Sequence, residues 1–322
     1  MQTDNLKMND GSGTLLLSLC MPTNGVSEWV FPSLDSIYKQ GIDNDLFEVV
    51  IMDNGNDPEF RERVAEYSKK YSNLRYCRTD KELFLSEPES YKNAKGEFIK
   101  FVNHRNIMAE GSIRYLLDFV KASIEEKPIV YFTNGNGKAE NGKEICSTFG
   151  EFVAKLGYFS TWSSGMAVWQ SDMDDMKDYE DFNYLFPHTD ILFHRRDSKE
   201  YIIDDIHLWD ELPQGKKPKG KYDLFNAFAV EFLNIIKSLV KSGDITDRDF
   251  LCVKDSNLEF LTTLYIDYII KKKYCSYDLS GYKESLSVYY TKKELRRKIS
   301  ERRIRDMKIA IKKALTRNHG AD

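Results

Sequence analysis

Residues 14–20 read TLLLSLC, and residues 47–53 read FEVVIMD. Both are largely apolar, with the pattern shown by strands that are buried on both faces of a parallel sheet. Turn-forming residues follow each run, MPTNG after the first and DNGND at the end of the second. Between the runs, Leu34 and Ile37 have helical spacing. Strand, helix and strand in this order predict a right-handed parallel unit.

The same alternation continues along the chain. Ligands of open α/β sheets bind at the carboxyl ends of the strands, so the loops after Cys20, Asp53 and Val102 are expected to face one crevice. From Tyr222 onward the apolar patterns are helical. The further predicted elements are a helix at 58–71, strands at 74–77 and 98–102, a helix at 111–124, a strand within 128–135 and a strand at 201–204.

Composition narrows the class of protein. The chain has 322 residues, 41% of them hydrophobic, and shows no run of about 20 apolar residues, so no membrane-spanning helix is predicted. The N-terminus MQTDNLKMNDGSG lacks the basic start and apolar core of a secretion signal, which predicts a cytoplasmic protein. An odd number of scattered cysteines argues against a disulfide framework or a cysteine zinc site. They are Cys20, Cys77, Cys146, Cys252 and Cys275.

Charge is distributed unevenly. Residues 292–317 hold twelve Lys and Arg against three Asp and Glu, a charge of +9, and the net charge of -4 leaves -13 for the remainder. Ile304, Met307, Ile311 and Leu315 fall at helical spacing within this tail. Such a helix suits an anionic membrane surface, with a packed helix or an oligomer contact as alternatives. Nucleic-acid binding is not expected, because the body is acidic and no recognition motif accompanies the tail.

The order PTN after the first strand, IMDNGND at the end of the second and then AKGEFIKF resembles the family 2 glycosyltransferases, over about two thirds of the chain. The resemblance implies the GT-A fold, an α/β fold with a mixed, mainly parallel sheet flanked by helices, here followed by a helical C-terminal region. It also implies a nucleotide-sugar donor, for which we favour a UDP-sugar.

The resemblance places Pro22, Thr23 and Asp53 at the donor nucleotide. A carboxylate at a strand end can accept hydrogen bonds from a base N–H or from ribose hydroxyls, and Asn54 follows it. The alternative for Asp53 and Asn54 is a purely structural role, as caps of the turn and of the following helix.

The family normally carries Asp-x-Asp after the AKGEFIKF strand, to hold Mg²⁺ or Mn²⁺ against the diphosphate. Here those positions read Asn103, His104 and Arg105, so the metal requirement is open. Either Arg105 and nearby lysines such as Lys217 replace the metal, or Asn103 and His104 still ligate one with help from His207, or the site is silent.

The resemblance also implies a catalytic base some sixty to a hundred residues beyond the metal motif. Asp190 is the first candidate and His188 the second, both at the start of a predicted helix after Pro187. The pair Glu180 and Asp181 is a rival. The small residues Ser164 and Gly165 resemble the family's element beside the donor sugar, although tight strand packing explains them equally well.

We therefore predict a disordered segment at 1–13, a nucleotide-sugar and acceptor domain at 14–215, a helical region at 216–290 and a basic tail at 291–322. The predicted reaction is inverting glycosyl transfer to a hydroxyl of a polysaccharide or lipopolysaccharide, including lipid-linked glycans. The protein would act in the cytoplasm or on the inner face of the plasma membrane. The alternative is a catalytically silent nucleotide-sugar binding or scaffolding subunit.

Overall fold

A computed structural model describes residues 14–136, 142–213 and 221–318, with side chains to residue 309. The chain forms two compact units. The first unit comprises Met1–Ile145 and Ser163–Pro213, and the second comprises Cys146–Trp162 and Gln214–Asp322. The bounds of the four predicted segments stay predictions, and 1–13 lies outside the described residues. In addition, the structure groups residues 146–162 with the C-terminal unit.

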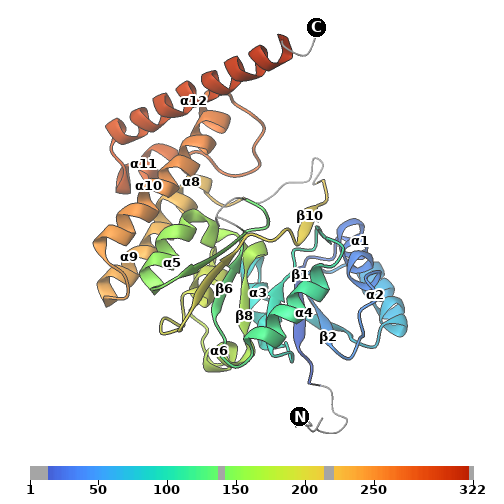
Figure 1. Cartoon of the computed structure of the whole chain (residues 1–322). Coiled ribbons are helices and arrows are strands. Elements are labelled where there is room, and N and C mark those ends of the chain that lie inside the picture. The colour runs from blue at the N-terminus through green and yellow to red at the C-terminus, as the bar shows by residue number, and fades with distance from the viewer. Residues whose placement is uncertain (1–13, 137–141, 214–220, 319–322) are drawn as a thin grey trace. The chain divides into compact units, whose positions relative to one another are not determined.

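A five-stranded sheet in the order β3-β2-β1-β4-β8 forms the centre of the first unit (Figure 1). β1, β2, β3 and β4 are parallel, and β8 runs antiparallel to β4. This arrangement confirms the predicted mixed, mainly parallel sheet. The strands are β1 (Leu17–Thr23), β2 (Phe47–Asp53), β3 (Leu74–Arg78), β4 (Phe98–Phe101) and β8 (Ala167–Trp169).

The first strand ends later than its sequence pattern predicts. The prediction that MPTNG is a turn is wrong for its first three residues, because β1 pairs with β2 as far as Thr23 opposite Asp53. The apolar residues in the sequence indicate only the deeply buried part of β1. Both strands therefore end at the same level of the sheet.

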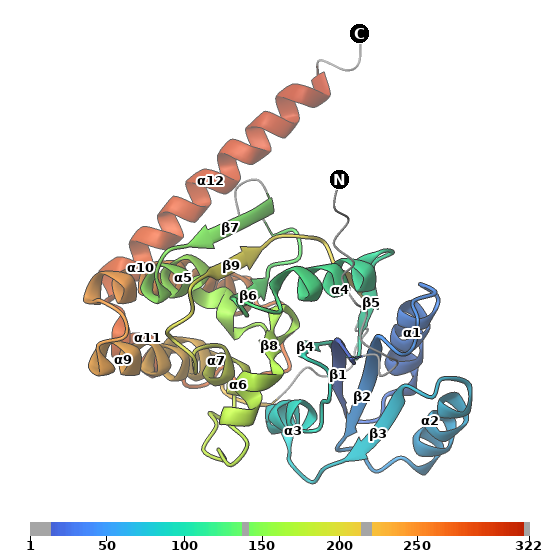
Figure 2. The ribbon, with the colours of Figure 1, turned by 60° about the horizontal axis from the view of Figure 1, so that its bottom comes forward.

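Helices cover both faces of this sheet. Odd-numbered residues of β1 and β2, such as Leu19 and Val49, share one apolar core with α1, α2 and α4. The opposite face meets α3, where Cys20 Sγ donates to Ser90 O. Figure 2 shows β1, β2 and β3 side by side in this arrangement. The helices are α1 (Ser27–Tyr38), α2 (Pro58–Lys70), α3 (Ser86–Lys92) and α4 (Ser112–Ser123).

Two smaller sheets complete the first unit. β5 (Asn106–Met108) pairs antiparallel with β10 (Trp209–Glu211), which places the chain after β4 beside residues that are a hundred positions later. The other sheet has the order β6-β9-β7. Its strands are β6 (Ile129–Phe132), β7 (Lys143–Cys146) and β9 (Tyr201–Asp204), and the remaining elements are η1 (Leu83–Leu85), η4 (Ser163–Gly165), α6 (Gln170–Asp175) and α7 (Pro187–Leu192).

A buried polar network joins the amino-terminal parts of the strands. Glu48 is buried, and its carboxylate accepts hydrogen bonds from Ser18 Oγ at 2.7 Å, the Lys95 backbone N–H at 2.6 Å and Arg75 Nη1 at 2.8 Å. A buried carboxylate is tolerated when its oxygens are paired in this way. The network therefore holds β1, β2, β3 and the turn before β4 together.

The second unit is helical, which confirms the predicted helical C-terminal region. Its longest packed helix, α10, begins with a capping box between Thr246 and Asp249. Gly150 of α5 lies against Asp249, since a Cβ there would be 2.6 Å from Oδ2. The helices are α5 (Phe149–Leu156), η3 (Gly157–Thr161), α8 (Leu224–Asn226), η5 (Ala227–Glu231), α9 (Phe232–Ser242), α10 (Asp247–Leu264), η6 (Tyr265–Ile270), α11 (Tyr282–Tyr289) and α12 (Lys292–Asn318).

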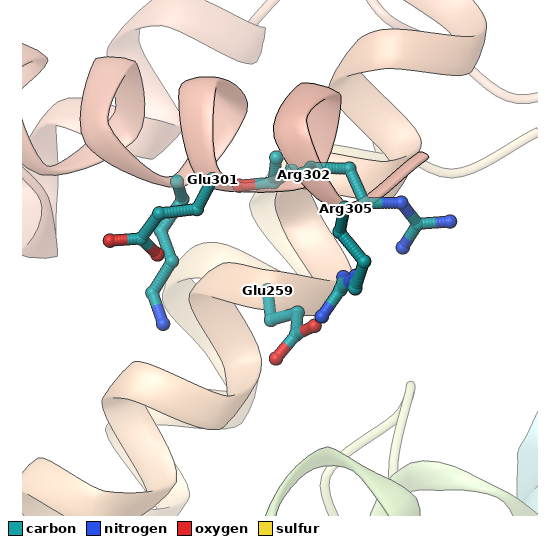
Figure 3. A pocket seen from close by; sticks show the side chains of 6 residues that line it. Glu259, Glu301, Arg302 and Arg305 are labelled. Atoms are coloured by element: carbon teal, nitrogen blue, oxygen red, sulfur yellow. The ribbon is translucent and has the colours of Figure 1, made fainter. Parts of the chain in front are cut away.

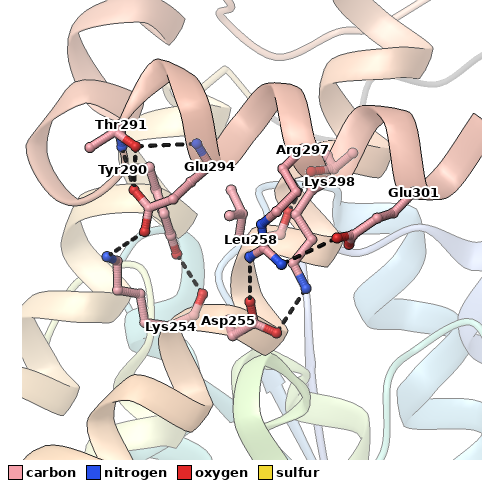
Figure 4. A network of polar contacts seen from close by, with 10 residues as sticks. Lys254, Asp255, Leu258, Tyr290, Thr291, Glu294, Arg297, Lys298 and Glu301 are labelled. Atoms are coloured by element: carbon pink, nitrogen blue, oxygen red, sulfur yellow. Dashed lines mark hydrogen bonds and ion pairs between the residues drawn. The ribbon is translucent and has the colours of Figure 1, made fainter.

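Ion pairs attach the first turns of α12 to α10. Lys254 pairs with Glu294 at 3.1 Å, and Asp255 pairs with Lys298 at 2.8 Å and with Arg297 at 3.7 Å (Figure 4). No helix within the described residues is both long and apolar enough to cross a membrane.

Candidate functional site

The carboxyl ends of β1 and β4 are connected by a side-chain hydrogen bond. Thr23 Oγ1 lies 2.8 Å from His104 Nδ1, and it also accepts a hydrogen bond from the Gly25 backbone N–H. The rings of His104 and Trp29 of α1 lie 5.1 Å apart. Two of the residues that the sequence proposed as separate donor and metal contacts are thus direct neighbours at the edge of the sheet.

Asp53 ends β2 beside them, and it is fully buried. Its Oδ1 accepts from the Gly55 backbone N–H at 2.7 Å, and its Oδ2 accepts from Tyr76 Oη at 2.7 Å. Burial and this hydrogen bond raise the pKa of Tyr76 to about 12. These contacts fit the alternative role for Asp53, in which the carboxylate stabilises a turn and does not bind the nucleotide. A role in nucleotide binding stays a prediction.

Only glycine fits at position 55. A Cβ on Gly55 would lie 2.4 Å from Asn24 O, so the loops after β1 and β2 approach too closely for a side chain. Asn54 adds a hydrogen bond between these two loops, because its backbone N–H donates to Thr23 O. Its side-chain amide donates to Lys81 O, in the chain after β3, at 3.2 Å. The half-buried Pro22 pairs with Met52 in the register of the two strands.

The Asn-His-Arg segment forms a tight turn before β5. Asn103 Oδ1 accepts a hydrogen bond from the Arg105 backbone N–H at 3.0 Å, and its carbonyl accepts from Asn106 N at 2.7 Å. The Arg105 guanidinium pairs with Glu211 of β10 at 3.2 Å and lies 5.6 Å from the ring centroid of Trp29. The positive charge of Arg105 is therefore partly balanced within the protein.

The residues at this turn do not fit a hard divalent cation. Within the described part of the chain, no three or more His, Cys, Asp or Glu side chains come together to hold a metal. His104 is bonded to Thr23, and His207 lies 3.4 Å from Asp210. Mg²⁺ and Mn²⁺ prefer several carboxylate oxygens, which Asn103, His104 and His207 do not supply.

A buried lysine, which sequence reasoning missed, lies next to the Ser-Gly element. Lys100 of β4 is 1% exposed, and its Nζ donates to Phe101 O at 2.9 Å and to Ser164 O at 2.5 Å. Burial lowers its pKa from 10.5 to about 7. The Lys100 amine therefore fastens the turn of Ser163–Gly165 to the carboxyl end of β4. The signal in the sequence was a single lysine inside the apolar strand FIKF.

Gly165 has a packing reason to be glycine. A Cβ at this position would lie 2.2 Å from the Tyr131 ring. This contact fits the alternative interpretation, in which tight packing explains why the residue at position 165 is small. Lining of a donor-sugar site by Ser164 and Gly165 stays a prediction, and Lys217 lies outside the described residues.

Asp190 has the properties expected of a base. The predicted helix after Pro187 is confirmed as α7, and Asp190 Oδ2 accepts a hydrogen bond from the Asn183 backbone N–H at 2.6 Å. Burial raises the pKa of Asp190 to about 6, against the lowering effects of the Asn183 bond and of His188. A carboxylate whose pKa lies near neutrality is well matched to general-base catalysis.

The two rivals of Asp190 have other partners. His188 is buried, and its Nδ1 lies 3.0 Å from Oε2 of the equally buried Glu87 of α3. Glu180 pairs with Lys92 at 2.8 Å and with Lys81 at 3.3 Å, and these lysines lower the pKa of its carboxyl group. Glu87 is a further residue that sequence reasoning missed, since it lies 101 positions away from His188.

Comparison with known proteins finds a matching sequence profile and structures of similar fold. The sequence profile described as Glycosyl transferase family 2 matches residues 18–138. No curated protein sequence matches the chain. S. aureus TarS 1-349 in complex with UDP-GlcNAc has a TM-score of 0.59 at 15% identity, covering 85% of this chain and 80% of that chain.

Two further structures of TarS 1-349 from S. aureus are similar. TarS without a named ligand has a TM-score of 0.55 at 15% identity, covering 80% of this chain and 75% of that chain. TarS in complex with UDP has a TM-score of 0.52 at 14% identity, covering 87% and 76%. At these identities the likeness establishes a shared fold, which is the predicted GT-A architecture.

Proposed function

We propose that this chain, whose residues 18–138 match the profile of glycosyl transferase family 2, transfers a glycosyl group from a UDP-sugar to a hydroxyl of a polysaccharide or lipopolysaccharide acceptor. The observation that carries the proposal is the meeting of the β1, β2 and β4 ends within the matched segment, where Thr23 and His104 are in contact. TarS, which has the same fold, has been solved with UDP-GlcNAc and with UDP. These complexes support a uridine nucleotide as the donor.

In the proposed inverting reaction, Asp190 takes the proton of the acceptor hydroxyl. The hydroxyl oxygen then forms a bond to the anomeric carbon, while the bond from that carbon to the diphosphate breaks on the opposite face and UDP leaves with its electron pair. The raised pKa of Asp190 supports this role, because the carboxylate gains basicity and is still ionised at neutral pH.

In this proposal, side chains of the protein, and not a metal ion, stabilise the negative charge of the leaving diphosphate. Arg105 and His104 both belong to the turn after β4, and a guanidinium can bond a diphosphate bidentately. Arg105 would then exchange its exposed partner Glu211 for the ligand. This exchange costs little, because a partly exposed ion pair contributes only a small amount of stability.

The first experiment measures donor hydrolysis and transfer with UDP-, dTDP-, GDP- and CDP-sugars, with and without EDTA. We expect turnover with a UDP-sugar that EDTA leaves unchanged. Loss of turnover in EDTA would refute the metal-free part of the proposal. No turnover with any donor and acceptor would favour the alternative, a silent nucleotide-sugar binding or scaffolding subunit.

Two variants test the residue roles. Asp190→Asn should retain donor binding and lose transfer by about 10² or more, with Asp118→Asn at an exposed position of α4 as the matched control. Asp53→Ala should weaken UDP binding in calorimetry by ~1–3 kcal/mol. Unaltered affinity would limit Asp53 to the turn contacts with Gly55 and Tyr76. Wild-type rates for Asp190→Asn would move the base to His188 or to the pair Glu180 and Asp181.

We further propose that α12 brings the protein to the anionic inner face of the plasma membrane. In the pocket between α10 and α12, Arg305 pairs with Glu259 at 2.6 Å (Figure 3), so part of the basic charge is already matched. Beyond it, Ile304 and Met307 are exposed among basic residues. The predicted continuation of their stripe, Ile311 and Leu315, lies outside the described side chains.

Flotation with phosphatidylglycerol vesicles tests the membrane proposal. The double variant Ile304→Glu and Met307→Glu should remain in the unbound fraction, whereas wild type should float, and phosphatidylcholine vesicles should bind neither. Equal flotation of wild type and variant would remove α12 from the contact and leave the packed helix or the oligomer contact as its role.

A further inference from the structure

Three of the exposed apolar side chains of the first unit lie on segments whose neighbouring residues contact one another or α7. Within its described residues, four large apolar side chains are more than a third exposed: Leu83 by 59%, Ile145 by 59%, Tyr179 by 41% and Tyr184 by 50%. Three of these belong to segments that side-chain contacts bring to α7, the helix that carries Asp190. Exposed apolar groups that gather in this way mark binding sites more often than single ones do.

Tyr184 directly follows a residue whose backbone binds the candidate base. Its neighbour Asn183 donates a backbone hydrogen bond to Asp190 Oδ2 at 2.6 Å. The Asn183 side chain in turn accepts from the backbone N–H groups of Leu185 and Phe186, at 2.9 and 3.0 Å. These bonds close a turn that fixes the backbone on both sides of Tyr184 while its ring remains half exposed.

Tyr179 lies at the other end of the same segment. Burial and the negative charge of Asp190 both raise the pKa of the Tyr179 phenol. The hydroxyl donates to Asp181 O at 3.0 Å, and the ring meets Phe182 edge to face at 4.7 Å. Lys92 Nζ donates to Tyr179 O at 3.0 Å and anchors the segment on α3.

Leu83 completes the group from the chain after β3. On one side of it, Lys81 pairs with Glu180 at 3.3 Å, and on the other side the ring of Phe84 lies 6.5 Å from that of His188. Leu83 also has a φ of 52°, in the left-handed region that a leucine adopts only at a cost. Strained backbone that holds an apolar side chain in solvent points to a ligand.

We propose that Leu83, Tyr179 and Tyr184, here called the acceptor platform, bind a pyranose ring of the acceptor glycan and present one of its hydroxyls to Asp190. A sugar ring has an apolar C–H face that suits tyrosine rings, and a rim of hydroxyls that suits polar neighbours. Asp181, Glu180 and Lys81 supply such a rim. The inference deepens the proposed transferase function and depends on it for the role of Asp190.

The test separates acceptor binding from donor chemistry in the full-length protein. Wild type, Tyr184→Ala, Tyr184→Phe and Tyr179→Ala are compared for hydrolysis of a UDP-sugar and for transfer to p-nitrophenyl pyranosides of glucose, galactose and N-acetylglucosamine. Ile145→Ala, which removes an equally exposed apolar side chain from β7, is the matched control. Saturation-transfer NMR with the same pyranosides and UDP reports binding without turnover.

Tyr184→Ala should raise the acceptor KM about tenfold or more, as loss of an aromatic contact predicts, and leave donor hydrolysis unchanged. Tyr184→Phe and Ile145→Ala should behave as wild type. Acceptor KM within twofold of wild type for Tyr184→Ala and Tyr179→Ala would overturn the platform, as would the absence of saturation transfer to every pyranoside. Loss of lipid-vesicle binding in these variants, with pyranoside binding unchanged, would also overturn the platform, and it would assign this surface to a membrane contact. Absence of donor hydrolysis in wild type, with saturation transfer retained, would instead overturn the transferase function and keep the sugar site.

Discussion

Replacing Lys100 by methionine should change how the stability of the first unit depends on pH. The lysine amine is 1% exposed, and it donates only to the carbonyls of Phe101 and Ser164. Within the described residues no carboxylate pairs with it, and burial lowers its pKa to about 7. Methionine has a similar length and carries no charge, so the variant removes the titration and keeps most of the apolar contact.

The sign and size of the effect follow from the two pKa values. The unfolded chain holds the lysine proton up to its ordinary pKa of 10.5, whereas the folded unit releases it above about 7. Between these values the unfolded state binds more protons, so the unfolding free energy of the wild type rises with pH. The slope approaches ~1.4 kcal/mol per pH unit, which gives ~2 kcal/mol between pH 7 and pH 9.

Urea unfolding followed by tryptophan fluorescence measures this effect, because three of the four tryptophans, Trp29, Trp169 and Trp209, belong to the first unit. The unfolding free energy of Lys100→Met minus that of wild type should fall by ~2 kcal/mol from pH 7 to pH 9. Lys95→Met, at an exposed lysine before the same strand, should show no such change. If the difference in unfolding free energy between Lys100→Met and wild type stays constant from pH 7 to pH 9, the Lys100 amine keeps its proton in the folded state. This result would refute the reasoning from burial.

Substitutions at two further positions and one pH profile also test the first unit. Glu48→Ala should lower the unfolding free energy by ~3 kcal/mol in urea, because it leaves Arg75 without its buried partner; a loss under 1 kcal/mol would contradict this. Thr23→Val should weaken UDP binding by ~1 kcal/mol in calorimetry through loss of the contact with His104, whereas Thr23→Ser should not, and equal affinities would separate this contact from the nucleotide. The transfer rate should rise with pH through about 6, as Asp190 ionises to its basic form, and a flat profile from pH 5 to pH 8 would exclude Asp190 as the base.

The sequence by itself determined the architecture of the first half and the helical nature of the end of the chain. Largely apolar runs such as residues 47–53 are stable only when they are buried on both faces, and turn residues limit where the runs stop. The helical periodicity after residue 222 is equally local. Even so, the end of β1 was misjudged, because pairing with β2 extends it through the polar residue Thr23.

The candidate site needed the tertiary structure. Whether Lys100 is solvated or buried, and whether His188 faces solvent or Glu87, depends on elements that are far apart in the chain. The same holds for Asp53, whose second oxygen meets Tyr76 of the next strand. Hydrophobic periodicity records how each segment faces the core, but it does not record which polar groups meet once the segments pack. These tertiary contacts determine the pKa of Asp190 and the surface around it, because desolvation and hydrogen bonding are properties of the packed unit.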